Sequence, residues 1–291
     1  MNQSRQTVEN GSGAEKIAII GLGLMGGSLA LAAREAGMRV AAYARREESR
    51  RIAQKSGMAD SVHASPAEAV RDANIVVLCT PIRSMPEIVA EILPELAAEC
   101  VVTDVGSTKS FPERCVAPLL SGTDSIFIGS HPLTGSEQSG TESATVGLYR
   151  DAAVFVTPSG DTPAWAYGRI KSFWEKTGAR VISISADEHD AVMARTSHLP
   201  HLAAAALVNA VMRDKADFAQ FCGRGFRDTT RIAEGPPEVW RDIALTNRDH
   251  IMSEIDNFIT SMQTIRKHLE NNDASGLEKL LAKARTGRRE I

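Results

Sequence analysis

The chain has 291 residues, of which 43% are hydrophobic and 24% are charged, and its formal net charge is −3. A chain of this length usually divides into two domains, and this composition is typical of a globular protein rather than a collagenous or disordered one. The nearly balanced charge and the 5% aromatic content argue against nucleic acid as a partner. A small-molecule substrate is therefore expected.

The cysteines and the N-terminus restrict the cellular setting. The 4 cysteines include no CxxC pair, so the sequence predicts no zinc site and no thioredoxin-like motif. Residues 1–15 are polar and lack the apolar core of a signal peptide, and no run of about 18 apolar residues follows. We expect a disordered tail over residues 1–15, a cytoplasmic protein, and neither a membrane nor a metal as partner.

Residues 16–185 alternate short β-rich runs with longer helical ones, as in a parallel sheet covered by helices. The expected strands are 17–20, 40–43, 75–79, 101–105, 126–128 and 154–156, with 181–184 as a further one. Most are nearly continuous apolar runs, which indicates strands buried on both faces. Between them, Ser65 and Glu68 have the spacing of a capping box, with Pro66 at the first helical position. An α/β domain is predicted.

Residues 186–291 are predicted to form only helices. Apolar residues recur every three or four positions at Ile251, Ile255, Phe258, Met262, Ile265 and Leu269. This spacing predicts a long amphipathic helix that begins near Pro237 or Glu238. Its apolar face needs a covering surface, so we expect a second, all-helical domain that forms a homodimer.

A glycine-rich turn follows the first expected strand and opens a helix. It contains Gly21, Gly23 and Gly26 in a GxGxxG pattern, with Leu24 and Met25 before the last glycine. In this context the glycines permit a tight turn, a close approach of the backbone to a pyrophosphate, and close packing of helix on strand. The N-terminus of the helix faces the negative charge. The turn therefore predicts a dinucleotide site.

The end of the second expected strand favours NADP over NAD. NAD enzymes usually place an acidic residue there for the ribose 2′-hydroxyl, whereas this chain has Tyr43, Ala44, Arg45 and Arg46. Two guanidinium groups can bind a 2′-phosphate through charge-assisted hydrogen bonds. Alternatively, Arg45 and Arg46 are a solvated charge pair at the start of a helix. We expect NADP as cofactor, with NAD as a weaker one.

Two further strand ends should line the cofactor cleft. Thr80 and Pro81 follow one strand, and Gly106 and Ser107 follow the next. Ligands of open α/β sheets bind beyond the carboxyl ends of the strands, which is where these residues fall. Ser107 is also a candidate N-cap, a role that does not prevent its hydroxyl from facing the cofactor.

Residues 130–140, SHPLTGSEQSG, form a glycine-rich loop after the fifth expected strand. Its His131 suits proton transfer, because the ordinary pKa of a histidine lets it accept a proton near neutral pH. The alternative is a loop histidine without a catalytic task. Its place at the end of a strand favours the catalytic interpretation.

The helical domain offers a second group of polar residues. Ser197 and His201 lie four residues apart, on one face of a helix that Pro200 should kink. His198 and His201 alone make a poor metal site, so a substrate-contacting face is expected instead. Further along are Arg224, Arg227, Arg231 and Arg241. Any of these could bind a substrate carboxylate or form a surface ion pair, and their spacing does not choose among them.

Taken together, these motifs resemble those of the prephenate and arogenate dehydrogenases of tyrosine biosynthesis. They are GLGLMGGS from Gly21, DVGSTK from Asp104, SHPLTGSEQSG from Ser130, TSHLPH from Thr196, and GFRDTTRIA followed by the Trp-Arg-Asp step at Trp240. The resemblance implies a Rossmann-type dinucleotide-binding domain joined to an all-helical dimerisation domain. It also implies an oxidative decarboxylation of prephenate or arogenate, in which hydride passes to NAD(P)+ and the ring loses CO2.

The resemblance also assigns roles to individual residues. His131 would take the proton of the ring hydroxyl, and Ser107 would position His131 and the nicotinamide. Ser197 and His201 would face the substrate, and Arg231 would hold its carboxylate. These roles go beyond what spacing alone supports.

Other interpretations stay open. One is an NADP-linked enzyme of the β-hydroxyacid dehydrogenase or imine reductase type, although such enzymes use a lysine where this chain has Ser197 and His201. Another is an NADP-sensing protein, which would need no proton acceptor such as His131. Prephenate and arogenate differ by a keto against an ammonium group, and Glu137 and Gln138 are the candidates to sense that difference.

Overall fold

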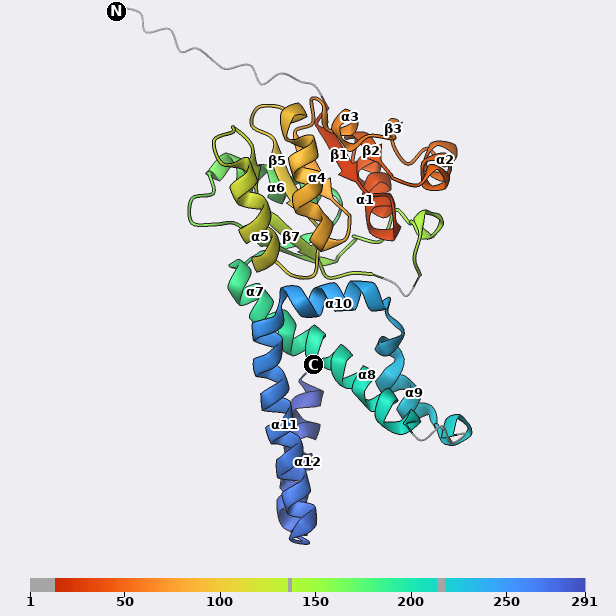
Figure 1. Cartoon of the computed structure of the whole chain (residues 1–291), viewed down its shortest axis with the longest axis vertical. Helices are drawn as coiled ribbons and strands as arrows, with labels where there is room; N and C mark the ends of the chain where they lie inside the picture. The colour runs from red at the N-terminus through yellow and green to blue at the C-terminus, as the bar shows by residue number, and fades with distance from the viewer. Residues whose placement is uncertain (1–13, 136–137, 214–217, 291) are drawn as a thin grey trace, which may run out of the picture. The chain divides into compact units, whose positions relative to one another are not determined.

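The computed structural model of the chain describes residues 14–135, 138–213 and 218–290. The chain divides into two compact units, each described below by itself (Figure 1). Unit 1 comprises Met1–Asp190 and Glu234–Thr246, and unit 2 comprises Ala191–Ala233 and Asn247–Ile291. The sequence predicts one boundary near residue 185, whereas the chain returns to unit 1 over Glu234–Thr246. Of the predicted tail, Glu15 already belongs to the fold, since its carbonyl accepts a hydrogen bond from the Arg39 N–H at 3.0 Å.

Unit 1 contains a parallel sheet of 6 strands in the order β3-β2-β1-β4-β5-β6. The strands are β1 (Lys16–Ile20), β2 (Arg39–Tyr43), β3 (Ser61–His63), β4 (Ile75–Leu78), β5 (Val101–Asp104) and β6 (Ile126–Phe127). The order reverses between β1 and β4, as in doubly wound nucleotide-binding sheets, so the predicted fold class is confirmed. Strand β3 was not predicted, because its three residues carry only one strongly apolar side chain.

Both faces of this sheet are buried, as the continuous apolar runs predict. Ile17 and Ile19 pack in one core, and Ala18 and Ile20 pack in the other. The helices of the first core are α1 (Leu24–Glu35) and α6 (Ala164–Lys176); those of the second are α3 (Pro66–Val70), α4 (Met85–Ile92) and α5 (Ser110–Val116). Helix α2 (Glu47–Lys55) buries only Ala53. Successive residues of a strand point to opposite faces, which explains the alternation.

A second sheet of unit 1 carries the candidate histidine. It consists of β7 (Gly129–Pro132), β8 (Ala153–Thr157) and β9 (Arg180–Ser183), with β7 antiparallel and β9 parallel to β8. His131 therefore lies within β7, paired with Phe155, and the prediction of a loop position was wrong. The sequence GSHP has almost no β propensity, and the apolar run of β8 supplies the strand on which it pairs.

Two helix predictions need correction. Pro66 does begin α3 with Ser65 at the N-cap, but no side-chain capping hydrogen bond forms, and the Glu68 carboxylate lies 3.5 Å from His63 Nδ1 instead. The predicted long helix is broken at Asn247 into α10 (Pro237–Thr246) and α11 (Arg248–Glu270). Asn247 leaves the helical conformation, with φ −119° and ψ 33°. Periodicity alone could not show this break, because α10 belongs to unit 1, where it buries Ile243 and Asp242, whereas α11 belongs to unit 2.

Unit 2 is helical throughout its described residues. Its elements are the end of α7 (Ala186–Met193), the π-helix η5 (Ala194–His198), α8 (Leu199–Met212), η6 (Phe218–Phe221), α9 (Arg224–Thr230), η7 (Arg231–Glu234), α11 and α12 (Ala274–Arg289). The wide π turn directly precedes the segment with Pro200, which has no N–H to continue an α-helical ladder. Within the described residues, none of the helices combines the length and the hydropathy that crossing a membrane requires.

We predict that Gly26→Ala destabilises unit 1, because a Cβ at this position of α1 would overlap the backbone carbonyl oxygen of Gly21. The expected loss is about 1–3 kcal/mol, measurable as a lower Tm. Gly168→Ala in α6 is the matched control, since a Cβ there meets nothing within 4 Å. The control should gain about 0.5–1 kcal/mol from its higher helix propensity. Equal Tm changes for the two variants would contradict this account.

Candidate active site

The turn between β1 and α1 has the geometry of a dinucleotide site. Gly21 has φ +109°, and a Cβ there would lie 2.6 Å from the carbonyl oxygen of Cys79. A Cβ on Gly23 would meet nothing within 4 Å, which leaves space for a ligand against the backbone. Helix α1 begins at Leu24 with no side-chain cap, so its first N–H groups are available to an anion.

The residues around this turn hold it in place. The Thr141 hydroxyl donates to the carbonyl of Leu22, and the Tyr149 hydroxyl donates to the carbonyl of Met25 at 2.8 Å. The N–H of Thr145 donates to Ser28 Oγ at 2.9 Å. These bonds come from a segment more than 100 residues further along the chain, and no local sequence pattern indicates them. They fix the turn in its bent form before any ligand binds.

The end of β4 adds a polar atom that a ligand can satisfy. Thr80 Oγ1 is buried and has no hydrogen-bond partner among the described residues. Its Cγ2 methyl lies 3.0 Å from the position a Gly21 Cβ would take, so the side chain adjoins the turn. A buried hydroxyl without a partner costs about 1–3 kcal/mol, a cost that a bound cofactor would relieve. Open space at Gly23 and this hydroxyl both fit a dinucleotide, and Pro81 follows as the N-cap of η1 (Ile82–Ser84).

The two arginines after β2 are placed to meet solvent or a ligand. Arg45 and Arg46 are both exposed, and Arg46 is the N-cap residue of α2. Arg50 folds back over this loop, where its Nη1 donates to the carbonyls of Ala44 and Arg45 at 2.8 Å each. Among the described residues neither Arg45 nor Arg46 forms an ion pair, so a 2′-phosphate would compete with no internal carboxylate.

A buried ion pair ties the end of β5 to β7. Lys109 and Asp104 are both fully buried, and Lys109 Nζ donates to the Asp104 carboxylate and, at 2.6 Å, to the carbonyl of Ser130. The same carboxylate accepts the N–H of Ser130 at 3.2 Å and that of Gly106 at 2.8 Å. Burial lowers the pKa of Lys109, and the charge of Asp104 opposes this shift. The pair holds β7 at the residue next to His131.

Three buried groups form a continuous chain of hydrogen bonds. His131 Nδ1 lies 2.8 Å from His189 Nε2, and His189 Nδ1 lies 2.8 Å from Asp190 Oδ1. The exposed fractions of His131, His189 and Asp190 are 8%, 0% and 1%. Burial lowers the pKa of His189, although its hydrogen bond to Asp190 opposes the shift. His189 is therefore a neutral imidazole near neutral pH.

Asp190 also caps the helix that follows the Ser107 loop. Its carboxylate accepts the N–H of Lys109 at 2.7 Å and that of Ser110 at 2.9 Å. Helix α5 begins at Ser110 with Lys109 as its N-cap residue, so Ser107 does not cap it. Ser107 is half-buried in the loop before this cap. Sequence reasoning missed Asp190 because the N–H groups it binds are 80 and 81 residues away.

Helix α10 contacts two segments of unit 1, the loop that follows β5 and the η1 turn. Thr246 Oγ1 lies 2.9 Å from Thr108 Oγ1, and the buried Asp242 lies 3.9 Å from Arg83 Nη1 in η1. Arg241 pairs with Asp242 at 2.8 Å. Arg241, one of the candidate carboxylate ligands, is thus engaged in an ion pair in unit 1.

Unit 2 holds the remaining predicted residues. Ser197 is half-buried in η5, His201 is buried in α8, and Arg231 is exposed at the start of η7. Ser197 lies in a π turn, so the α-helical spacing that predicted a shared face with His201 does not apply over this stretch. Burial lowers the pKa of His201. Gln138 is exposed, and Glu137 lies outside the described residues.

One histidine and two arginines of unit 2 make structural contacts. His198 Nδ1 lies 3.1 Å from Asn247 Nδ2, at the break between α10 and α11. Arg224 lies 3.4 Å from Asp228, and Arg227 Nε donates to the carbonyl of Cys222 at 3.2 Å. Within the described part of the chain no group of three His, Cys, Asp or Glu side chains is arranged to bind a metal.

Comparison with known proteins identifies the family. The chain is 34% identical over 267 residues to the cyclohexadienyl dehydrogenase of Zymomonas mobilis, which covers 90% of each. Its structure is similar to that of prephenate dehydrogenase from Aquifex aeolicus in complex with hydroxyphenyl propionate and NAD+, with a TM-score of 0.89 and 31% identity over 96% of this chain and 99% of that one. Arogenate dehydrogenase from Synechocystis gives a TM-score of 0.83 and 28% identity, over 94% and 99% of the two chains.

Two family models account for most of the chain. The prephenate dehydrogenase nucleotide-binding domain matches residues 29–183, and the prephenate dehydrogenase dimerization domain matches residues 185–283. The matched ranges contain the motifs that begin at Asp104, Ser130, Thr196 and Gly225, whereas the glycine-rich motif at residues 21–28 precedes them. The chain therefore belongs to the prephenate dehydrogenase family.

Proposed function

We propose that this protein oxidatively decarboxylates prephenate, arogenate or both, with NADP+ as its preferred hydride acceptor. The observation that carries the proposal is the buried His131, which lies on β7 and whose Nδ1 is 2.8 Å from His189 Nε2. The open dinucleotide turn at Gly23 supports the cofactor part. The names of the relatives support the substrate class.

The chemistry divides between the cofactor and the chain. A nicotinamide cofactor, with its pyrophosphate held at the turn between β1 and α1, would supply the hydride acceptor for C4 of the ring. His131 accepts the proton of the hydroxyl on that carbon as the hydride leaves, so no positive charge builds up on the substrate. The bond from the ring to its carboxylate then breaks to release CO2, its electron pair makes the ring aromatic, and the phenol oxygen regains a proton.

Other residues keep the roles that the resemblance implies. We propose that Ser107 hydrogen-bonds the ring hydroxyl or the nicotinamide, since its loop is pinned at both ends by Asp104 and Asp190. Ser197 and His201 as substrate contacts and Arg231 as the carboxylate ligand remain predictions. So does the role of Gln138 in distinguishing a keto from an ammonium group.

The proposal is tested by following reduced nicotinamide by absorbance with prephenate and with arogenate, each with NADP+ and with NAD+. We predict turnover of at least one substrate and a kcat/KM with NADP+ at least about tenfold higher, because one guanidinium–phosphate bond contributes about 1.5 kcal/mol or more. Arg45→Ala should reduce that preference by about tenfold and leave kinetics with NAD+ nearly unchanged.

Arg51→Ala is the matched control for this measurement. Arg51 is also an exposed arginine of this region, but it pairs with Glu47 at 2.6 Å within α2. Its replacement should leave the cofactor preference unchanged. A native protein that uses NAD+ equally well would reject the cofactor assignment, and absence of turnover with either substrate would reject the function.

We predict that His131→Asn lowers kcat by about 100-fold or more, because an amide can hydrogen-bond the hydroxyl but cannot take its proton. In the native protein kcat/KM should fall as the pH drops and His131 becomes protonated, since the protonated imidazole cannot accept. This acidic limb should disappear in His131→Asn. The control is His268→Asn, at a histidine of α11 that contacts Asp273. A variant at His131 with normal kcat would place the proton acceptor elsewhere.

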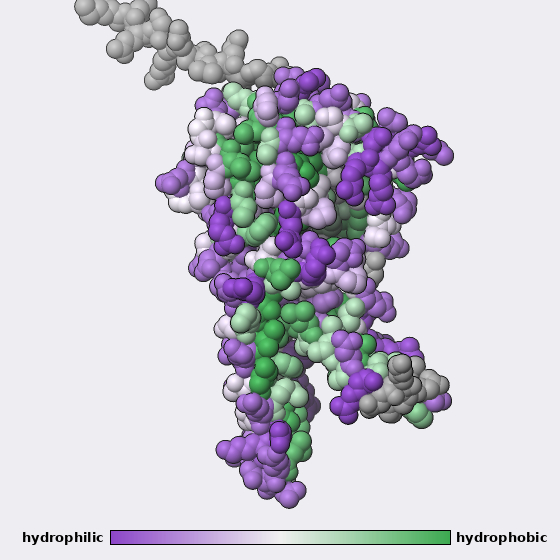
Figure 2. All heavy atoms as spheres, in the orientation of Figure 1, coloured by the Kyte–Doolittle hydropathy of each residue, from purple (hydrophilic) through white to green (hydrophobic). Residues whose placement is uncertain are grey.

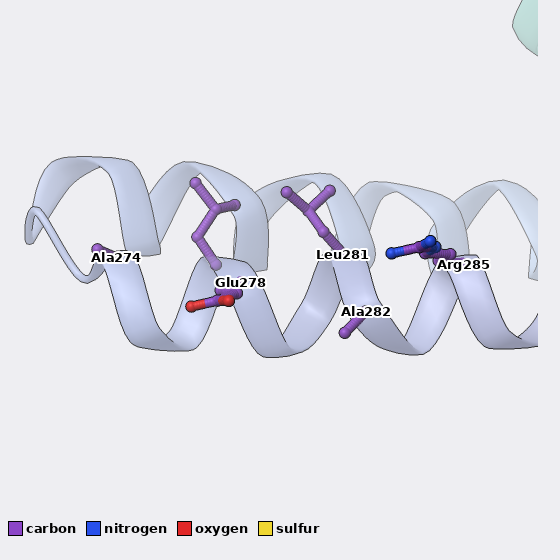
Figure 3. Close-up of a pocket in the computed structure, with 6 residues that line it drawn as sticks. Ala274, Glu278, Leu281, Ala282 and Arg285 are labelled. Carbon is purple, nitrogen blue, oxygen red and sulfur yellow. The ribbon is translucent and has the colours of Figure 1, made fainter.

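We also propose a homodimer formed through unit 2. Apolar side chains that remain exposed on α11 are Met252, Phe258, Ile259, Met262 and Leu269, and Figure 2 shows apolar atoms gathered along this helix. A surface hollow on α12 is lined by residues of that helix alone, among them Leu281 and Arg285 (Figure 3). One helix cannot enclose a ligand, so the hollow suits the surface of another chain. The match to a dimerization domain supports this proposal.

Phe258→Asp should dissociate this dimer, because it places a charge in the centre of the apolar face, where Phe258 is 42% exposed in the single chain. Light scattering should then report the mass of a monomer. Thr260→Asp is the control, since a residue two positions along lies on the opposite side of the helix. A native protein that is monomeric at micromolar concentration would contradict the proposal.

A further inference from the structure

His189 and Asp190 are two fully buried polar residues for which the proposed reaction gives no task. Both lie on α7, and their hydrogen bonds lead directly to the catalytic histidine candidate on β7. The rings of His131 and His189 meet edge to face, with centroids 5.0 Å apart and planes at 73°. Phe155 on β8 contacts the His189 ring in the same manner at 5.4 Å and 82°. The orientation of His189 is thus fixed by packing as well as by hydrogen bonds.

The proton positions in the hydrogen-bond series His131–His189–Asp190 follow from the Asp190 end, where the donors are known. Backbone N–H groups can only donate, and Asp190 accepts one on each oxygen, from Lys109 and from Ser110. Burial alone would raise the pKa of Asp190, but these bonds and the one from His189 outweigh it and keep the pKa below its usual value. Asp190 is therefore a carboxylate, and His189 Nδ1 carries the proton between them.

The next two proton positions follow in sequence. A neutral imidazole protonated at Nδ1 has its lone pair at Nε2. His189 Nε2 therefore accepts, and His131 Nδ1, 2.8 Å away, must donate to it. His131 Nε2 is left with the lone pair of that ring.

We propose that His189 and Asp190 are positioning residues that hold His131 in the tautomer whose Nε2 accepts the substrate proton, and that they stabilise the imidazolium formed when it does. This inference rests on the proposed function. The two residues act only through His131, so neither needs to touch substrate or cofactor. Without this acceptor at Nδ1, either ring nitrogen could carry the proton, and a fraction of the protein would present an N–H to the substrate hydroxyl.

The charges around His131 favour the same assignment. From β5 and the loop after it, Asp104 and Lys109 face this region as a buried pair whose charges offset each other. From α7, Asp190 supplies a carboxylate whose charge is relayed through His189. From β8, Phe155 adds no charge. Asp190 is therefore a charge that favours an imidazolium at His131, an effect that the low dielectric of the interior strengthens.

The carboxylate of Asp190 also links the two halves of the site. It caps α5 at Lys109 and Ser110, and so fixes the loop that carries Ser107. One side chain thereby sets both the tautomer of His131 and the position of Ser107. An amide at position 190 would place its NH2 group either at Oδ1, against His189 and the Lys109 N–H, or at Oδ2, against the Ser110 N–H. Only the first arrangement reverses the donors and acceptors that lead to His131.

The first test reads the tautomer without turnover. In protein labelled with 15N-histidine, long-range couplings between ring protons and nitrogens show which nitrogen carries hydrogen. We expect His131 protonated at Nδ1 in the native protein and a mixture of both tautomers in His189→Leu, which lacks the acceptor, with signals assigned from their loss in His131→Asn. A native His131 protonated at Nε2, or a His131 that stays protonated at Nδ1 alone in His189→Leu, would overturn the inference.

The second test measures kcat and its pH dependence. His189→Leu removes the acceptor and should lower kcat by about 100-fold with little change in KM. Its acidic limb should move to lower pH, because an imidazolium without support loses its proton more readily. His189→Gln keeps an oxygen acceptor toward His131 and should recover most of the kcat. A change in KM alone would indicate that His189 has only a structural role. Equal losses of kcat in His189→Leu and His189→Gln would indicate the same.

A double variant separates the two roles further. In a His131→Asn background, His189→Leu should lower kcat no more, because both changes remove the same function. A kcat loss in the double variant equal to the product of the two single-variant losses would contradict the inference. Cofactor binding and Tm should be measured on every variant to establish that it folds. A native protein inactive with both substrates would reject the proposed function alone, since the tautomer is read in the absence of substrate.

Discussion

The carboxylate of Asp190 accepts hydrogen bonds from an imidazole and from two backbone N–H groups, and the candidate site is arranged around it. A carboxylate buried this deeply is stable only when each oxygen is satisfied, so the three donors and the acceptor constrain one another. This single group places the start of α5, the ring of His189 and, through that ring, the ring of His131. Removal of its charge would release all three together.

The cofactor side depends on a different constraint, the steric fit between β1, β4 and α1. At the point where the strand order reverses, the Gly21 turn lies against the carbonyl of Cys79 so closely that a side chain would not fit. Bonds from Thr141, Thr145 and Tyr149 then hold the turn open toward solvent at Gly23. Both halves of the site are thus fixed before ligands bind, which lets binding energy go into orientation rather than into ordering of the chain.

What the sequence could predict depends on whether a signal is local. Strands β1, β2, β4 and β5 are apolar runs and the GxGxxG turn is contiguous, so all were predicted within a residue or two. Strand β7 was missed because its residues acquire strand geometry only by pairing with β8. Asp190 was missed because it acts on N–H groups 80 residues away, and no local pattern records such a contact. The break at Asn247 was hidden because α10 and α11 share one apolar periodicity while α10 packs in unit 1.

The central claim is that His131 Nε2 is the atom that accepts the proton of the substrate hydroxyl. It is tested most directly by a crystal structure of this protein with NADP+ and 4-hydroxyphenylpropionate, a ligand that keeps the ring hydroxyl but cannot react. The account predicts the phenol oxygen within about 2.6–3.2 Å of His131 Nε2, with Nδ1 still bonded to His189. A phenol oxygen bound elsewhere, or a His131 ring turned so that Nδ1 faces the ligand, would contradict it.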